Sequence, residues 1–112
     1  MKRGEIWLVN LDPTMGSEMR KTRPVVIISS DLVGILPLKI VVPFTDWKGR
    51  YESASWMVRI DPDEANGLSK SSAADGLQVR SISEKRLVKR LGMLSPIQIA
   101  TIVQAVVNVL QK

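Results

Sequence analysis

Apolar and polar residues alternate over short segments in the first third of the chain. Residues 4–11 place Ile6 and Leu8 on one face, which predicts a strand with one well-buried face. Residues 24–29 contain four consecutive β-branched residues, and apolar side chains on both faces predict a central strand. The polar residues 14–22 between these two segments predict a flexible loop.

More strands are expected farther along the chain. Residues 38–44 alternate, and Pro43 is expected to end this strand or to place it at a sheet edge, because proline has no N–H. Residues 46–53 read as a polar loop, and residues 84–90 fit a short helix as well as a strand. Further strands are expected at residues 56–60, 77–82 and 88–94.

The carboxyl end carries the signals of a helix. Ser95 and Gln98 have the spacing of a capping box, with Pro96 in the first turn. Apolar residues then recur at helical spacing, at Ile99, Ile102, Val103, Val106, Val109 and Leu110. This segment is too short and too polar to span a bilayer.

Several short strands followed by one terminal helix indicate a mainly β protein, with a small, strongly bent sheet or barrel. The 112 residues fit a single domain, residues 1–112. An apolar fraction of 45% is ordinary for a globular protein and excludes widespread disorder.

The composition excludes several kinds of site. The chain has no cysteine, which excludes disulfides, thiolate metal sites and a cysteine nucleophile. It has no histidine, so a zinc site of the usual kind and histidine acid–base catalysis are excluded too. Acid–base chemistry must use carboxylates, lysine, tyrosine or the electrostatic effect of arginine, and we expect no metal and no cofactor.

Positive charge is concentrated in parts of the chain. The net charge is +5, and residues 80–90 contain five basic side chains and one acidic one. Such segregation suits a polyanion partner, while the alternative is a solvated basic surface. The first residues lack the apolar run of a signal peptide, so we expect a cytoplasmic protein.

A set of short blocks occurs in a characteristic order. They are residues 3–9, 11–13, 16–18, 23–29, 41–45, 78–82 and 90–95. In this order and spacing they resemble the MazF/PemK family of toxins from bacterial toxin–antitoxin systems, over nearly the whole chain. The resemblance implies a small SH3-like β-barrel of the PemK/CcdB type with a C-terminal α-helix, acting as a homodimer.

The resemblance also implies a function. It implies a metal-independent endoribonuclease that cuts single-stranded RNA at short sequences. It implies a cognate antitoxin of the MazE type, whose acidic flexible segment covers the RNA groove. Two alternatives stay open: a toxin of the same fold that poisons DNA gyrase without cleavage, and a non-catalytic RNA-binding barrel.

Three residues match the family's catalytic positions. Arg23 precedes a proline, which favours an extended backbone and presents its side chain at the mouth of a strand. It matches the catalytic arginine, whose planar guanidinium can bind two phosphate oxygens. Thr45 matches a threonine at a strand end, and Glu18 matches a loop glutamate that orients the arginine or accepts the 2′-hydroxyl proton.

A second set of residues is expected to bind RNA. Trp47, Lys48 and Arg50 interleave an aromatic ring with cations, as suits stacking of unpaired bases; alternatively, Trp47 covers the open end of the barrel. The other members lie in the loop before Arg23 or in the late motif block: Ser17, Arg20, Lys21, Gln78 and Arg80. Arg80 has the alternative of pairing with an acidic residue.

One position departs from the family's pattern. Some members have an acidic residue directly before the glutamine of the late strand, where this chain has Leu77. Asp75 lies two residues earlier, on the same face if the segment is extended, and is a candidate substitute. The identity of the general base is therefore open.

Overall fold

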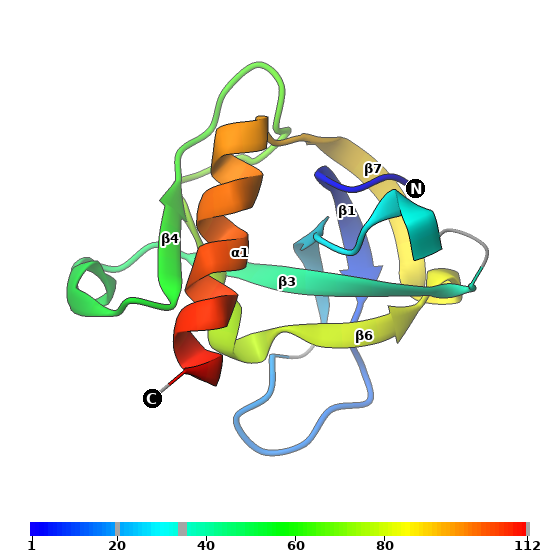
Figure 1. Cartoon of the computed structure of the whole chain (residues 1–112), viewed down its shortest axis with the longest axis horizontal. Coiled ribbons are helices and arrows are strands. Elements are labelled where there is room, and N and C mark those ends of the chain that lie inside the picture. Colours follow the sequence, from blue (N-terminus) through cyan, green and yellow to red (C-terminus); the bar gives the residue numbers. More distant parts are fainter. Residues whose placement is uncertain (20, 34–35, 112) are drawn as a thin grey trace.

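The computed structural model describes residues 1–19, 21–33 and 36–111 (Figure 1). It contains the strands β1 (Glu5–Asn10), β2 (Thr22–Ile27), β3 (Leu38–Asp46), β4 (Met57–Ile60), β5 (Ser72–Asp75), β6 (Arg80–Ser83) and β7 (Leu87–Met93). One α-helix follows, α1 (Pro96–Leu110), and four short 3₁₀ turns connect the strands: η1 (Asp31–Val33), η2 (Gly49–Ser53), η3 (Gly76–Gln78) and η4 (Glu84–Arg86). The predicted mainly β fold with one C-terminal helix is confirmed.

The strands form one antiparallel, strongly curled sheet. Their order is β4-β5-β3-β2-β1-β7, and β6 pairs with β3 beside this path. Helix α1 lies against the curled sheet, next to β4 and η3 (Figure 1). The predicted central strand is confirmed, because β2 lies between β1 and β3 with Val25, Val26 and Ile27 buried.

The strand does not end at Pro43, although it lacks a partner on one side there, as expected for proline at an edge. Pro43 lies inside the nine-residue strand β3 and pairs with Val25 of β2. On its other side β3 pairs with β6 up to Val41 and with β5 from Phe44 onward. Pro43 thus stands where β3 changes partners, and the absence of a ladder on that side explains how the strand accommodates proline.

Strand β1 contributes to two hydrophobic clusters. Ile6 packs in one cluster with Phe44 and the helix residue Ile102, whereas Val9 packs in the other. The register against β7 shifts twice because β7 carries the extra residues, while β1 pairs with β2 without interruption, so the alternation of β1 is kept. The predicted face of Ile6 and Leu8 is buried at Ile6 but only half-buried at Leu8, which lines a cavity.

Several boundaries differ from the prediction. Strand β5 was not expected, because its Ser-Ala-Ala-Asp sequence contains no β-branched or aromatic residue. The strand expected at 77–82 begins only at Arg80, since residues 76–78 form η3. The loop expected at 46–53 contains η2, and the ambiguous segment 84–90 divides into η4 and the start of β7.

The predicted capping box at the start of α1 is confirmed. The Gln98 N–H donates to Ser95 Oγ at 3.2 Å, and the Ser95 N–H donates to Gln98 Oε1 at 3.0 Å. These bonds satisfy helix N–H groups that have no partner within the helix. In the parts of the chain that the structure describes, no helix has the length and apolar character needed to cross a membrane.

Candidate active site

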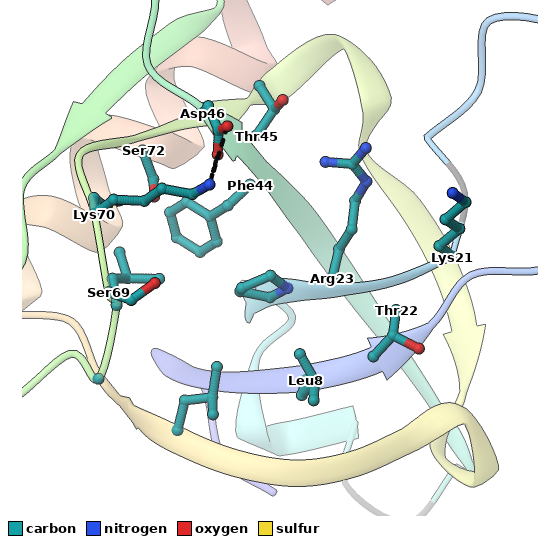
Figure 2. A pocket seen from close by; sticks show the side chains of 14 residues that line it. Leu8, Lys21, Thr22, Arg23, Phe44, Thr45, Asp46, Ser69, Lys70 and Ser72 are labelled. Atoms are coloured by element: carbon teal, nitrogen blue, oxygen red, sulfur yellow. Dashed lines mark hydrogen bonds and ion pairs between the residues drawn. The ribbon is translucent and has the colours of Figure 1, made fainter.

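Arg23 and Thr45 lie on the wall of the same cavity. Arg23 belongs to β2 and Thr45 to β3, and Figure 2 shows the Arg23 guanidinium directed toward the Thr45 side of the opening. The cavity has a volume of about 400 Å³ and both residues line it. Two adjacent strands therefore bring a cation and a hydroxyl to one opening.

This cavity is lined by both apolar and polar residues. The apolar residues are Leu8, Pro24, Phe44, Leu68 and Leu91, and the polar ones are Lys21, Thr22, Arg23, Thr45, Asp46, Ser69, Lys70 and Ser72. Lys21 was expected from the sequence to bind RNA, and it lies beside Arg23. Asp46, Ser69, Lys70 and Ser72 were not anticipated.

Asp46 and Lys70 form an ion pair at the cavity mouth. Lys70 Nζ lies 3.0 Å from Asp46 Oδ1 and 3.1 Å from Asp46 Oδ2 (Figure 2). The two residues are 24 positions apart in sequence, and the pairing of β3 with β5 brings them together. No signal in the sequence could find this pair, because β5 itself has no strand signature.

Glu18 lines a different cavity from Arg23. That second cavity has a volume of about 350 Å³ and is lined by Ser17, Glu18, Leu77, Gln78, Val79 and Arg80. The Glu18 carboxylate accepts a hydrogen bond from the Met15 N–H at 2.7 Å, within its own loop. Three expected RNA-binding residues, Ser17, Gln78 and Arg80, thus gather around Glu18.

Gln78 attaches the loop after β1 to the turn before β6. Its Oε1 accepts from the Met19 N–H at 3.1 Å, and its Nε2 donates to the Ser17 carbonyl at 3.0 Å. Arg86 holds the base of the same loop, donating to the carbonyls of Asn10 and Asp12 at 3.1 and 2.7 Å. Gln78 and Arg86 therefore act here on the loop backbone.

Asp75 is buried, with 7% of its surface exposed, and lines neither cavity. Its carboxylate accepts from the Leu77 N–H at 3.0 Å and so caps η3. Burial raises the pKa of Asp75, and the hydrogen bonds from the backbone of Leu77 and Gln78 offset part of that rise. In this conformation Asp75 stabilises a turn, and it does not replace the acidic residue missing at Leu77.

The aromatic residues after β3 form a separate cluster. The Arg59 guanidinium lies 5.3 Å from the centre of the Trp47 ring, and Tyr51 meets Trp47 edge-on at 5.9 Å. Arg50 lies over Tyr51 at 5.3 Å. Trp47, Arg50 and the exposed Lys48 do not line either of the two cavities, so the structure does not bring them together with Arg23.

Arg80 and Arg20 are two further basic residues that were expected to bind RNA. Arg80 forms no ion pair with a carboxylate in residues 1–19, 21–33 or 36–111. Arg20 lies outside the described residues.

Comparison with known proteins identifies relatives over most of the chain. Residues 2–110 match the family model of the PemK-like, MazF-like toxin of type II toxin–antitoxin systems. The chain is 32% identical to Endoribonuclease MazF9 of Mycobacterium tuberculosis over 117 aligned residues, covering 94% of this chain and 92% of the relative. It is 34% identical to Endoribonuclease MazF of Staphylococcus saprophyticus over 97 residues, covering 85% and 78%.

Solved structures share the fold. The crystal structure of MazF from Deinococcus radiodurans superposes with a TM-score of 0.79 at 19% identity, covering 98% of this chain and 96% of that one. A MazE–MazF structure from the same organism gives a TM-score of 0.73 at 20% identity, covering 98% and 95%.

Proposed function

Because this chain belongs to the PemK-like, MazF-like toxin family of type II toxin–antitoxin systems, we propose that it is a sequence-specific endoribonuclease. Its substrate is single-stranded RNA, including mRNA in the cytoplasm, and cleavage arrests growth. The reaction uses no metal ion or other cofactor. The observation that carries the proposal is the position of Arg23 and Thr45 at one cavity.

The proposed reaction uses the RNA's own 2′-hydroxyl as nucleophile. The 2′-oxygen attacks the adjacent phosphorus, the bond to the 5′-oxygen breaks, and the products are a 2′,3′-cyclic phosphate and a 5′-hydroxyl. The 2′-hydroxyl gives up one proton and the leaving 5′-oxygen gains one. The protein therefore has to hold the phosphate in line, move protons and stabilise the negative charge that develops.

Arg23 supplies the positive charge in this scheme. A guanidinium presents several N–H donors in one plane and stays protonated, so it stabilises phosphate oxygens and is a poor base. Thr45 donates a hydroxyl hydrogen bond to the same phosphate. Support comes from the shared cavity and from the family's catalytic positions, which these two residues match.

Glu18 is our candidate for the group that accepts the 2′-hydroxyl proton. It lines the neighbouring cavity, and its carboxylate is bonded to Met15 within the same loop. In this proposal the loop carries Glu18 toward the scissile nucleotide when RNA binds. Lys21 contacts phosphate beside Arg23, while Ser17, Gln78 and Arg80 contact RNA near Glu18.

We propose two protein partners as well. The first is a second copy of the chain, in a homodimer. The second is a cognate antitoxin of the MazE type, whose acidic flexible segment covers the RNA groove. The net charge of +5 suits that segment, and a structural neighbour from Deinococcus radiodurans was solved as a MazE–MazF complex.

The test is to incubate the purified protein with a long single-stranded RNA in the presence of a chelator and to map the ends. We expect cuts at one short sequence, with cyclic phosphate and 5′-hydroxyl ends. RNA that is bound but stays intact would favour a non-catalytic RNA-binding barrel. Binding should weaken with salt, with a logarithmic slope of about −0.7 per phosphate contacted.

A further inference from the structure

The ion pair between Asp46 and Lys70 stands at the mouth of the cavity that contains Arg23 and Thr45. The Asp46 and Lys70 side chains remain 60% and 66% exposed, and an ion pair this exposed contributes little to folding stability. Its charged groups face the opening in Figure 2, where a bound molecule would meet them. Ligand recognition therefore explains its position better than stability does.

The backbone around this pair is held in place. Asp46 pairs with Ser72 across β3 and β5, and the Trp47 N–H donates to the Ser71 carbonyl at 3.1 Å. The buried Ser72 hydroxyl donates to the Lys70 carbonyl at 2.9 Å. The sheet thus fixes the backbone of Asp46, and the Ser72 hydroxyl ties the backbone of Lys70, just before β5, to the sheet, while both side chains stay accessible.

The cavity has the size and the mixed lining of a site for a small ring that carries polar groups. Its volume of about 400 Å³ lies within the range of small-molecule sites, roughly 300–1,000 Å³. Five apolar residues line the cavity, and the charged side chains of Asp46 and Lys70 stand exposed at its opening. A nucleobase has apolar faces and a hydrogen-bonding edge, which match these two regions.

We propose that this cavity binds the nucleobase next to the scissile phosphate, and that Asp46 and Lys70 select guanine there. The inference rests on the proposed function, because a phosphate held by Arg23 and Thr45 brings the neighbouring base to the cavity mouth. Asp46 and Lys70 then determine sequence specificity, whereas Arg23 and Thr45 act on the bond that is cut.

The choice of guanine follows from the donors and acceptors available. Lys70 offers only donors and the Asp46 carboxylate only acceptors. The Watson–Crick edge of guanine presents one acceptor, O6, followed by two donors, N1–H and N2–H. In the proposed complex Lys70 Nζ leaves its position between the two Asp46 oxygens and bonds O6, and both Asp46 oxygens then accept from N1–H and N2–H. Cytosine, adenine and uracil lack two adjacent donors, so they cannot complete this arrangement.

The first test compares maps of cleaved ends. We expect the wild type to require guanine at one position beside the cut. Asp46→Asn and Lys70→Met should each lower that preference roughly 5- to 150-fold, the discrimination of a good bidentate base contact. Asp61→Asn is the matched control, since Asp61 forms an exposed ion pair with Arg59 at 3.0 Å but does not line the cavity. An unchanged map in the Asp46 and Lys70 variants would overturn the inference and leave the nuclease proposal intact.

The second test does not depend on cleavage. Each of the four 3′-nucleoside monophosphates is titrated into the protein, and the backbone amide signals of Ser69, Lys70 and Ser72 are followed by NMR. We expect 3′-GMP to shift these signals and to bind at least 5-fold tighter than 3′-CMP, with Asp46→Asn removing the difference. That result would hold even if the RNA were not cut. No shift at these residues, or tighter binding of another nucleotide, would overturn the inference.

Discussion

Arg23 and Thr45 stand on neighbouring strands, each two residues beyond the last pair of the β2–β3 ladder, Val25 and Pro43. Continuing the antiparallel register places these two residues opposite each other, with their side chains on the same face. Both line the cavity in Figure 2. Arg23 and Thr45 thus form a polar pair just beyond the end of an otherwise apolar ladder.

For RNA cleavage, the hydroxyl of Thr45 should matter more than the shape of the Thr45 side chain. Thr45→Val keeps the volume but removes the donor, and we expect kcat to fall by about 10²–10³, as for loss of one donor to a developing oxyanion. Thr45→Ser should retain most of the activity, because the hydroxyl remains. Both variants are compared by RNA cleavage rates; a valine variant that cuts at the wild-type rate would exclude Thr45 from the chemistry.

Replacing Glu18 should cost less than replacing Arg23. Glu18→Gln keeps an oxygen that can accept from the Met15 N–H, so the loop turn is preserved. General base help is typically about 10²–10⁴ in rate, and we expect a loss in that range. Single-turnover cleavage measures it. A rate equal to that of the wild type would show that another group takes the proton.

Gln78 should control the mobility of the loop after β1. Gln78→Leu removes both hydrogen bonds, whereas Gln78→Glu keeps an acceptor for the Met19 N–H. One hydrogen bond contributes about 0.5–1.5 kcal/mol net, so amide hydrogen exchange at Met19 should rise roughly 2- to 12-fold in the leucine variant. The glutamate variant serves as the control. Equal exchange at Met19 in the leucine variant and the wild type would contradict the role of Gln78.

Asp75 should make stability depend on pH. Burial raises its pKa in the folded protein, so the folded state holds this proton more tightly than the unfolded chain does. The contribution of Asp75 to the free energy of unfolding should fall as pH rises from the ordinary carboxyl range to the raised pKa. Asp75→Asn removes this dependence and keeps an oxygen to accept from the Leu77 N–H.

Urea unfolding of the wild type and Asp75→Asn at a series of pH values measures this effect. The asparagine variant should gain stability relative to the wild type as pH rises from the ordinary carboxyl range to the raised pKa of Asp75. Subtracting the two curves cancels the carboxylates that both proteins share. A difference that does not vary with pH would contradict the assignment.

The elements that were predicted correctly have strong local signals. The helix α1 begins with a capping box that is visible in four consecutive residues, and β2 is recognisable from its run of β-branched side chains. The candidate pair Arg23 and Thr45 was found because each lies in a motif block at a strand end. Their common cavity then follows from the pairing of two predicted strands.

The rest depends on contacts between distant segments. The mouth of the cavity needs residues 69–72, which reach Asp46 only because β5 pairs with β3. The sequence of β5 gives no strand signal, so neither the strand nor the Asp46–Lys70 pair was predictable. The loop contacts of Gln78 and the turn cap by Asp75 were not predictable for a related reason, because the turn η3 interrupts the strand expected there.

The most direct test of the central claim is the single-turnover rate of RNA cleavage by Arg23→Ala. Arg90→Ala is the matched control, because Arg90 is an arginine on β7 that pairs with Glu5 and lines neither cavity. Thermal unfolding checks that both variants fold. We predict that Arg23→Ala loses roughly 10³-fold or more of the rate, as is typical of arginines that stabilise a transferring phosphoryl group, while Arg90→Ala cuts at nearly the wild-type rate. A folded Arg23→Ala variant that cleaves as fast as Arg90→Ala would contradict the proposed active site.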